Sequence, residues 1–411
     1  MLIGNAVVGQ SGGPTAAINA TLAGVIKGAL EADCIDKIYG MKNGIEGFAD
    51  KRLIELNGLF SDSANLDTLK QTPAAALGSC RKKLPKPDST APADIEFYER
   101  VFSVIEEYNI RYFFYIGGND SMDTVAKMTL YAEKKGVDIR IIGVPKTIDN
   151  DLALTDHTPG FGSAAKYIAT TMREIIRDCN VYTVRAVTVV EIMGRDAGWL
   201  TASSAIGRIV DGCAPDYVYL PERDFDMEEF FADIEKAFEK HPAVVIAVSE
   251  GLRFSDGTYV GEGTQSGSTD VFGHKYLAGT GKALELAIKD KFGCKVRSVE
   301  LNLPQRCAAH ILSFTDIDES VKIGCEAVRA AVSGVSGEVM VFVRRDSEKY
   351  VCDIEHRSVM GIANATRYVP DEFIVESNND VTDSCCAYLL PLIDGEYPTV
   401  FEKGLPKHIV L

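Results

Sequence analysis

The chain has 411 residues, and at about 150 residues per domain this length predicts two or three domains. The composition, with 46% hydrophobic and 25% charged residues, 36 Gly and 15 Pro, is that of an average globular protein and excludes disordered, collagen-like and mucin-like chains. The net charge of −16 repels nucleic acid and anionic membranes, so we expect neither as a partner, and an anionic ligand requires a local basic pocket.

Short β-branched or aromatic runs alternate with segments of helical period along the chain. Strands are predicted at residues 5–8, 37–39, 112–116, 139–144, 186–192, 217–220, 244–248, 296–301 and 339–343. Helices are predicted at residues 16–30, 94–107, 121–134, 163–177, 199–206, 227–240, 279–289 and 318–331. This alternation is typical of parallel α/β architecture and argues against a bundle or a sandwich.

The ten cysteines and six histidines are spread along the chain without CxxC, HExxH or a Cys/His cluster. This spacing argues against a disulfide framework and against a histidine-ligated metal. The first basic residue is Lys27, so the start does not resemble a signal peptide, and the apolar run 243–248 is too short to cross a bilayer. We therefore expect a soluble, cytoplasmic protein.

The first predicted strand runs into GQSGGPT, which ends at Thr15, and then into a helix. Gly12 and Gly13 allow a sharp turn that directs backbone N–H groups outward at a helix start, where anions bind. A tight turn without a ligand explains this segment equally well.

A second glycine turn, GGNDS at residues 117–121, joins another strand to a helix, with Ser121 as the expected N-cap. Ligands of open α/β sheets bind at the carboxyl ends of strands, so the two turns predict two walls of one phosphate cleft. Asp120 places a carboxylate where a phosphate would be expected, and it repels anions.

The third segment, PKTIDND at residues 145–151, ends a strand. In extended backbone Asp149 and Asp151 point to one face, close to Lys146 and Thr147. Two carboxylates suit Mg²⁺ together with a general base, and a lysine is a point cation for phosphate oxygens. A polar turn closed by Asx hydrogen bonds is the alternative, and the segment alone favours it.

Arginines follow several of the later strands: EIMGRDAGW contains Arg195, and Arg297 and Arg306 flank LNLPQ, while SEG at residues 249–251 follows another strand. Arginine binds phosphate in bidentate fashion, so these residues could form the basic pocket that an acidic protein requires. A single arginine is more often a solvated surface residue.

Residues 158–165 contain GxGxxA, a pattern found in dinucleotide-binding sites. The preceding residues do not have a strand pattern, so we favour a helix capped by Ser163.

Taken in order, GGP, LGS-Cys80-Arg81, GGND, PKTIDND, GFGSAA, EIMGRDAGW, SEG and the Arg-x8-Arg pair resemble the phosphofructokinase family over most of the chain. At Lys146 and Asp120 the sequence resembles the pyrophosphate-dependent branch of the family, because ATP-dependent members have glycine at both positions. The resemblance implies two Rossmann-like parallel-sheet lobes that face an active-site cleft. It implies a phosphoryl-donor lobe at 1–160 plus about 306–360 and a sugar-phosphate lobe at 161–305 plus about 361–411.

The resemblance also implies an activity: reversible, Mg²⁺-dependent transfer of a phosphoryl group from diphosphate to the 1-hydroxyl of fructose 6-phosphate, giving fructose 1,6-bisphosphate and phosphate. The catalytic residues would be Asp149 as general base, Lys146 and Asp120. The diphosphate ligands would be Gly12, Gly13, Arg81 and Lys146. The sugar-phosphate ligands would be Thr147, Asp149, Met193, Gly194, Arg195, Glu250, Arg297 and Arg306. Mg²⁺ would be held by Asn119 and Asp151.

Some family arginines reach a neighbouring subunit's site, which implies a homo-oligomer, a dimer or a tetramer. Arg185 stands one residue farther from Arg195 than the ATP-enzyme pattern expects, so its role stays open. Two alternatives remain, an ATP-dependent 6-phosphofructokinase and a non-catalytic sugar-phosphate sensor. The sensor would be expected to lose the base or the lysine, yet Asp149 and Lys146 are both present.

Overall fold

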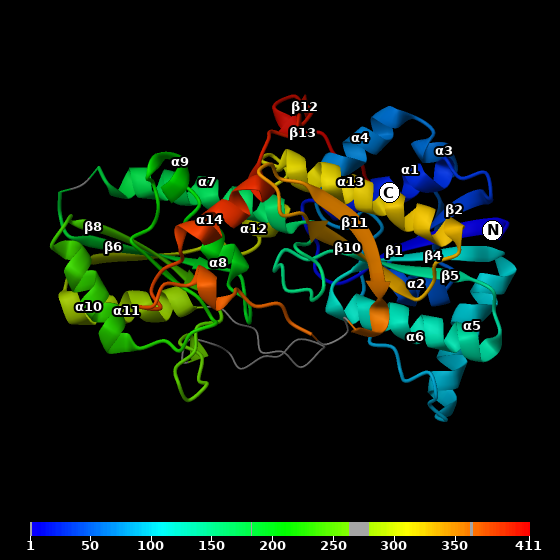
Figure 1. The fold of residues 1–411 in the computed structure, drawn as a ribbon, viewed down its shortest axis with the longest axis horizontal. Helices are drawn as coiled ribbons and strands as arrows, with labels where there is room; N and C mark the ends of the chain where they lie inside the picture. The colour runs from blue at the N-terminus through cyan, green and yellow to red at the C-terminus, as the bar shows by residue number, and fades with distance from the viewer. Residues whose placement is uncertain (1, 182, 263–278, 362–364) are drawn as a thin grey trace.

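The computed structural model describes residues 2–181, 183–262, 279–361 and 365–411, which form two α/β lobes (Figure 1). Each lobe has its own sheet, one of seven strands and one of four. The predicted α/β class with two parallel-sheet lobes is confirmed.

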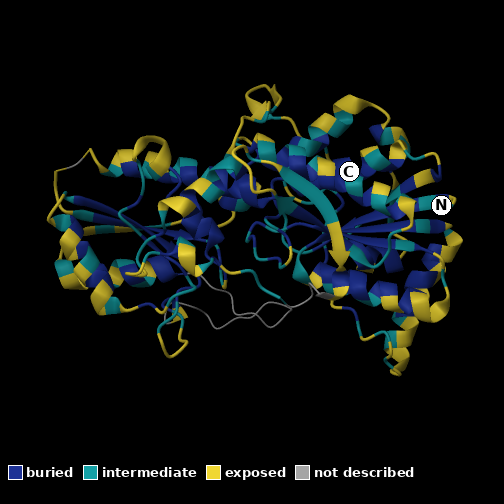
Figure 2. Ribbon diagram, in the orientation of Figure 1, coloured by how far each residue is buried: buried dark blue, intermediate teal, exposed yellow. Residues whose placement is uncertain are grey.

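The first lobe has the seven-stranded sheet, in which the five central strands are parallel and each edge strand is antiparallel. In spatial order the strands are β11 (Cys352–Ser358), β10 (Glu338–Arg344), β5 (Arg140–Pro145), β4 (Ile110–Gly117), β1 (Gly4–Gln10), β2 (Ile35–Met41) and β3 (Leu53–Glu55). Its helices are α1 (Ile18–Leu30), α2 (Gly44–Ala49), α3 (Asn57–Phe60), α4 (Ser63–Gln71), α5 (Pro92–Glu107), α6 (Asn119–Lys135) and α13 (Phe314–Ser333). The central strands are buried on both faces, which explains their continuous apolar runs (Figure 2).

Helix α13 is distant in sequence from α1 but packs directly on it. A Cβ atom on Gly24 would lie 2.1 Å from the Val321 carbonyl oxygen, and one on Gly324 would lie 2.4 Å from the Thr21 carbonyl oxygen. The two backbones therefore touch, and a larger side chain at either glycine would separate the helices.

The second lobe has four parallel strands, which in spatial order are β7 (Tyr217–Tyr219), β8 (Ala243–Ser249), β6 (Ala186–Ile192) and β9 (Lys295–Glu300). Its helices are α7 (Phe161–Cys179), α8 (Trp199–Ser203), α9 (Arg208–Asp211), α10 (Met227–Phe238), α11 (Thr280–Phe292), α12 (Pro304–Cys307) and α14 (Asp383–Leu389). Short 3₁₀ turns η2 (Val359–Gly361), η3 (Asp371–Phe373) and η4 (Leu390–Ile393) and a hairpin of β12 (Phe401–Glu402) and β13 (Leu405–Pro406) complete the described chain.

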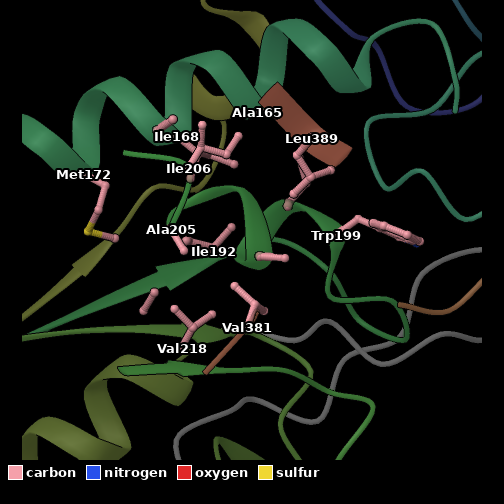
Figure 3. Close-up of a cluster of buried hydrophobic side chains, with 14 of the residues drawn as sticks. Ala165, Ile168, Met172, Ile192, Trp199, Ala205, Ile206, Val218, Val381 and Leu389 are labelled. Carbon is pink, nitrogen blue, oxygen red and sulfur yellow. The ribbon is translucent and has the colours of Figure 1, made fainter. Parts of the chain in front are cut away.

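A buried apolar cluster joins α7, α8, β6 and α14 in the second lobe (Figure 3). Trp199 and Leu389 are both fully buried in it, although they are far apart in the sequence. The Trp199 indole N–H donates to the Arg367 carbonyl over 3.1 Å, which satisfies its polar atom. The cluster thus ties a late segment of the chain to the lobe formed by its middle.

All the predicted strands are present, but β3, β11 and the short hairpin strands β12 and β13 were missed. β11 is an edge strand of mostly polar sequence, so it lacks the apolar signal that revealed the others. Helix α7 begins at Phe161 and is not capped by the Ser163 side chain: the Asp316 carboxylate instead accepts hydrogen bonds from the N–H groups of Gly160 and Ser163.

The domain boundaries expected from the sequence stay a prediction, with one difference at the C-terminal end. The Gln71 amide donates to the Val400 carbonyl, and Lys42 Nζ donates to the Leu411 carbonyl. The last residues therefore contact the first lobe, whereas the sequence grouped them with the second. Across the described ranges, none of the helices is both long and apolar enough to span a membrane.

Candidate active site

A cavity of about 550 Å³ lies where strand ends of the two lobes meet. The segments that follow β1, β4 and β5 form one wall, and those that follow β6 and β8 form the other. Its lining comprises Gly12, Gly13, Arg81, Lys83, Gly118, Asn119, Asp120, Ser121, Lys146, Thr147, Asp149, Asp151, Arg195, Asp196, Ala197, Glu250 and Thr366. The predicted cleft at the carboxyl ends of the strands is present.

The two glycine turns lie side by side because β1 and β4 are paired neighbours. Gly12 has a φ of +78°, which favours glycine, and the Ser11 N–H donates to the Ile116 carbonyl over 2.9 Å. Helix α6 begins at Asn119, so Ser121 is not its N-cap. A Cβ atom on Gly117 would lie 1.9 Å from Ser121 Oγ, which shows that this hydroxyl packs against the strand end.

Lys146 is a buried cation, with 3% of its surface exposed. Its Nζ donates to the Gly13 carbonyl over 2.5 Å, and a Cβ atom on Gly12 would lie 3.5 Å from the same Nζ. Burial lowers the pKa of Lys146 to about 8, although the charges of Asp149 and Asp151 oppose this shift. The positive charge therefore lies directly beside the first glycine turn.

The sequence predicted extended backbone around Asp149 and Asp151, and this prediction is wrong. Asn150, between them, has a left-handed φ of +55°. Both carboxylates still line the cavity. The Asp149 N–H donates to Thr147 Oγ1 over 3.1 Å, which closes a short turn. Burial raises the pKa of Asp149 against the opposing charge of Lys146, and burial together with the charge of Asp149 raises the pKa of Asp151.

Asn119 and Asp151 supply oxygen atoms of the kind that Mg²⁺ prefers. Asn119 Nδ2 lies 3.5 Å from Asp151 Oδ2, so the two side chains are neighbours. Asn119 Oδ1 is buried and has no hydrogen-bond partner among the described residues. An oxygen left in this state fits a cation that would share the site with Asp151 and substrate phosphates.

The second-lobe wall is organised by Glu250. Gly194 has a φ of +139°, and its N–H donates to Glu250 Oε1 over 3.3 Å. Burial raises the pKa of Glu250 to about 8, against the stabilising hydrogen bond from Gly194. The Met193 N–H donates to Gln305 Oε1 over 3.2 Å, so Met193 and Gly194 lie behind the wall that Arg195 and Glu250 present.

The structure separates the predicted arginines into two groups. Arg81 and Arg195 line the cavity, and Arg306 Nη1 would lie 3.8 Å from a Cβ atom on Gly13. Arg297 is exposed on β9 and lines a different hollow, of about 250 Å³. Arg185 stacks on the Phe238 ring, with its guanidinium carbon 5.0 Å from the ring centroid.

Six lining residues were not assigned to the site from the sequence: Lys83, Gly118, Ser121, Asp196, Ala197 and Thr366. Lys83 Nζ lies 4.0 Å from Asp120 Oδ1, at the exposed side of the cavity. The basic run RKK at residues 81–83 was a signal for Lys83. Nothing local indicates Thr366, which reaches the cavity because it pairs with Leu152 in an isolated bridge.

A two-lobe α/β architecture with a polar cavity between glycine turns is typical of proteins that bind phosphates at the carboxyl ends of their strands. The family model described as "Phosphofructokinase" matches residues 5–331, and the chain belongs to that family.

Two curated relatives extend over nearly the whole chain. A protein of Halomonas elongata named "Pyrophosphate--fructose 6-phosphate 1-phosphotransferase" is 42% identical, and the alignment covers 98% of this chain and 95% of that protein. A protein of Methylococcus capsulatus with the same name is 38% identical, with 99% and 96% covered. Among solved structures, a pyrophosphate-dependent phosphofructokinase from Nitrosospira multiformis matches with a TM-score of 0.88 and 35% identity, covering 99% of this chain and 96% of that one.

Proposed function

We propose that this protein transfers a phosphoryl group from diphosphate to the 1-hydroxyl of fructose 6-phosphate, reversibly, giving fructose 1,6-bisphosphate and phosphate. The observation that carries the proposal is the buried Lys146 between the first glycine turn and Asp149. The names of the full-length relatives support the choice of both substrates.

In this reaction the Asp149 carboxylate accepts the proton of the sugar 1-hydroxyl, and the hydroxyl oxygen attacks the terminal phosphorus of diphosphate. The bond from that phosphorus to the bridging oxygen breaks, and phosphate leaves. Phosphoryl transfer depends mainly on positioning and charge neutralisation. Lys146 neutralises charge on the transferring and leaving groups, and its burial strengthens this effect because little water screens it.

The donor would be bound by the Gly12 and Gly13 turn and by Arg81, at the first-lobe wall. Asn119 and Asp151 would hold Mg²⁺. The ion would supply charge neutralisation to the phosphate oxygens. Because Asn119 contributes no charge, Asp151 is the only anionic side chain of the pair.

The sugar phosphate would lie against the second-lobe wall, with Thr147 and Asp149 across from it. We assign Arg195, Glu250 and Arg306 to its binding, with Met193 and Gly194 shaping the wall. Arg297 would complete the 6-phosphate site of a second copy of the chain, because it is exposed and lies outside this chain's own cavity. The protein would therefore be a homo-oligomer. Its place in the cytoplasm is a separate part of the proposal.

Asp120 and Lys146 would select diphosphate over ATP. The Asp120 carboxylate occupies the donor side of the cavity, where an α-phosphate of ATP would meet a like charge. Diphosphate ends at its second phosphoryl group and avoids this contact.

The test is a comparison of diphosphate and ATP as donors, with fructose 6-phosphate and with Mg²⁺ present or removed by chelation. We expect turnover with diphosphate to exceed turnover with ATP, and to be lost on chelation. A preference for ATP would favour the ATP-dependent alternative. Binding of sugar phosphate without turnover of either donor would favour the sensor.

A further inference from the structure

A buried histidine lies at the base of the loop that carries Asp149. The two legs of this loop meet where Thr147 and Gly160 form an isolated parallel bridge. The Thr158 hydroxyl donates to the Thr147 carbonyl over 2.8 Å, and Thr147 Oγ1 accepts from the Asp149 N–H over 3.1 Å. The position of Asp149 is therefore set, through two hydrogen bonds, by residues 157–160, the returning leg of the loop, which includes His157.

His157 is 3% exposed, and both of its ring nitrogens face carboxylates. Nδ1 lies 2.9 Å from Asp156 Oδ2, and Nε2 lies 2.7 Å from Glu319 Oε2 on α13. A neutral imidazole has only one N–H donor, so one nitrogen would set its lone pair against a carboxylate oxygen. The imidazolium ion donates to both carboxylates, and the geometry therefore favours the charged ring.

Neighbouring side chains orient the two carboxylates that face the charged His157 ring. The Tyr350 hydroxyl donates to Glu319 Oε1 over 2.8 Å, and Arg344 Nε donates to Asp156 Oδ2 over 3.2 Å. The ring stacks on Phe342, with ring centroids 4.4 Å apart. The titratable and charged groups around the cluster are Asp316 and Glu319 of α13, Arg344 of β10, Tyr350 just before β11, Cys352 of β11, Tyr388 of α14, Arg367, and Asp156.

Burial by itself lowers the pKa of His157, but the charges and hydrogen bonds of Glu319 and Asp156 outweigh it and raise that pKa to about 9. Burial also raises the pKa of Cys352 to about 12, and raises the pKa of Tyr350. Both of these groups therefore stay neutral while His157 titrates.

We infer that His157 is a positioning residue for Asp149: its charged ring ties the returning leg of the loop to α13. This rests on the function proposed above, since Asp149 is the general base of that reaction. A ring nitrogen of His157, a Glu319 carboxylate oxygen and Cys352 Sγ lie within 4.8 Å of one another, a spacing that could also hold a metal ion. The direct contact of each ring nitrogen with a carboxylate argues against that use.

The first experiment compares His157→Gln with His241→Gln. His241 makes a similar pair with Asp216, 2.8 Å long, but it is partly exposed and lies in the second lobe. We expect His157→Gln to lower kcat by about 10- to 100-fold, because a small displacement of a catalytic group has effects of this size. The dissociation constants for fructose 6-phosphate and for diphosphate, measured by calorimetry, should change less than about threefold, since the phosphate-binding groups lie on other segments. His241→Gln should match wild type.

The second experiment uses Glu319→Gln, which leaves the ring with one carboxylate partner and lowers its pKa. The ratio of kcat in this variant to kcat in wild type should fall as pH rises from about 6 to about 8, because the variant loses its imidazolium in that range. Taking the ratio removes the titration of Lys146, which both proteins share. Nitrogen NMR of histidine-labelled wild type should show one ring that remains doubly protonated up to about pH 9.

Full kcat in a folded His157→Gln protein contradicts the inference, as do equal losses of kcat and of affinity for both substrates. If that variant does not fold, a ratio for Glu319→Gln that is independent of pH, or wild-type histidines that all deprotonate below about pH 8, contradicts it. Zinc bound to wild type and absent from the variant would assign the cluster to a metal and also overturn it. Wild type without any phosphoryl transfer contradicts the proposed function itself, whereas active wild type with a fully active variant contradicts only the positioning role.

Discussion

The cavity has a floor, formed by the buried Lys146 with the partly buried Asp149 and Asp151, and an exposed rim, formed by Lys83 and Asp120. Lys146 is 3% exposed, whereas the side chains of Lys83 and Asp120 are 63% and 47% exposed. Charges on the floor interact strongly because little water screens them, while the rim pair is 4.0 Å long and well solvated. The difference predicts large effects on the reaction with diphosphate for the floor and small ones for the rim, where Asp120 acts on the choice of donor.

The largest effect is expected for Asp149→Asn. Removing the proton acceptor should lower turnover by about two to four orders of magnitude, while fructose 6-phosphate binding measured by calorimetry is retained. Asp346→Asn, at an exposed carboxylate outside the cavity lining, is the matched control. Turnover of Asp149→Asn at the wild-type rate would remove Asp149 from the role of base.

Lys146→Gly should lower kcat/KM for diphosphate by about 10²- to 10³-fold, the effect of removing one preorganised electrostatic group. Adding Asp120→Gly should raise ATP use above that of either single variant, because both obstacles to ATP are then gone. The two changes should be non-additive, since the residues share one ligand. Steady-state rates with both donors across wild type, the single variants and the double variant provide the test, and full diphosphate use by the double variant would refute the assignment.

Arg306→Ala and Arg297→Ala should each weaken fructose 6-phosphate binding by ~1.5–3 kcal/mol, about 10- to 150-fold. Arg306 is expected to act within its own chain, since it lies beside Gly13, whereas Arg297 is expected to act on a neighbouring copy. Mixing Arg297→Ala chains with Asp149→Asn chains should therefore restore activity, because some mixed sites would contain both intact residues. Recovery in the Arg306→Ala mixture but not in the Arg297→Ala mixture would reverse this assignment.

Diphosphate use should depend on pH through Lys146, whose pKa is lowered to about 8. The charged form is present below that value and is lost above it, so kcat/KM for diphosphate should fall by about tenfold per pH unit beyond pH 8. Lys146→Arg, which stays protonated, should show no such decline even where its absolute rate is low. A flat wild-type profile between about pH 7 and 9.5 would contradict a catalytic charge on this lysine.

The smallest effect is expected at the rim. Lys83→Ala should change the apparent KM for diphosphate by no more than about fivefold, since exposed ion pairs contribute about 0–1 kcal/mol. Lys289→Ala, on an exposed face of α11, serves as the control for loss of one surface charge. A change as large as that for Lys146→Gly would contradict the small contribution expected of this exposed pair.

Much of the fold could be predicted because the central strands are buried on both faces and therefore have apolar sequences, as in β4 and β8. β11 could not, because an edge strand with a polar sequence has no such pattern. The turn at Asn150 was misread as extended backbone, since asparagine tolerates left-handed φ without any further local signal.

The α/β class, the two glycine turns and the run from Lys146 to Asp151 could be read from the sequence, because these features depend on neighbouring residues. Which distant side chains meet depends on the packing of the folded chain. It brings Arg306 beside Gly13 and leaves Arg297 in another hollow, and it joins His157 to Glu319 across 162 positions of the chain. Contacts of this kind depend on how whole helices and strands pack, as with α1 against α13, and no local pattern of residues specifies that packing.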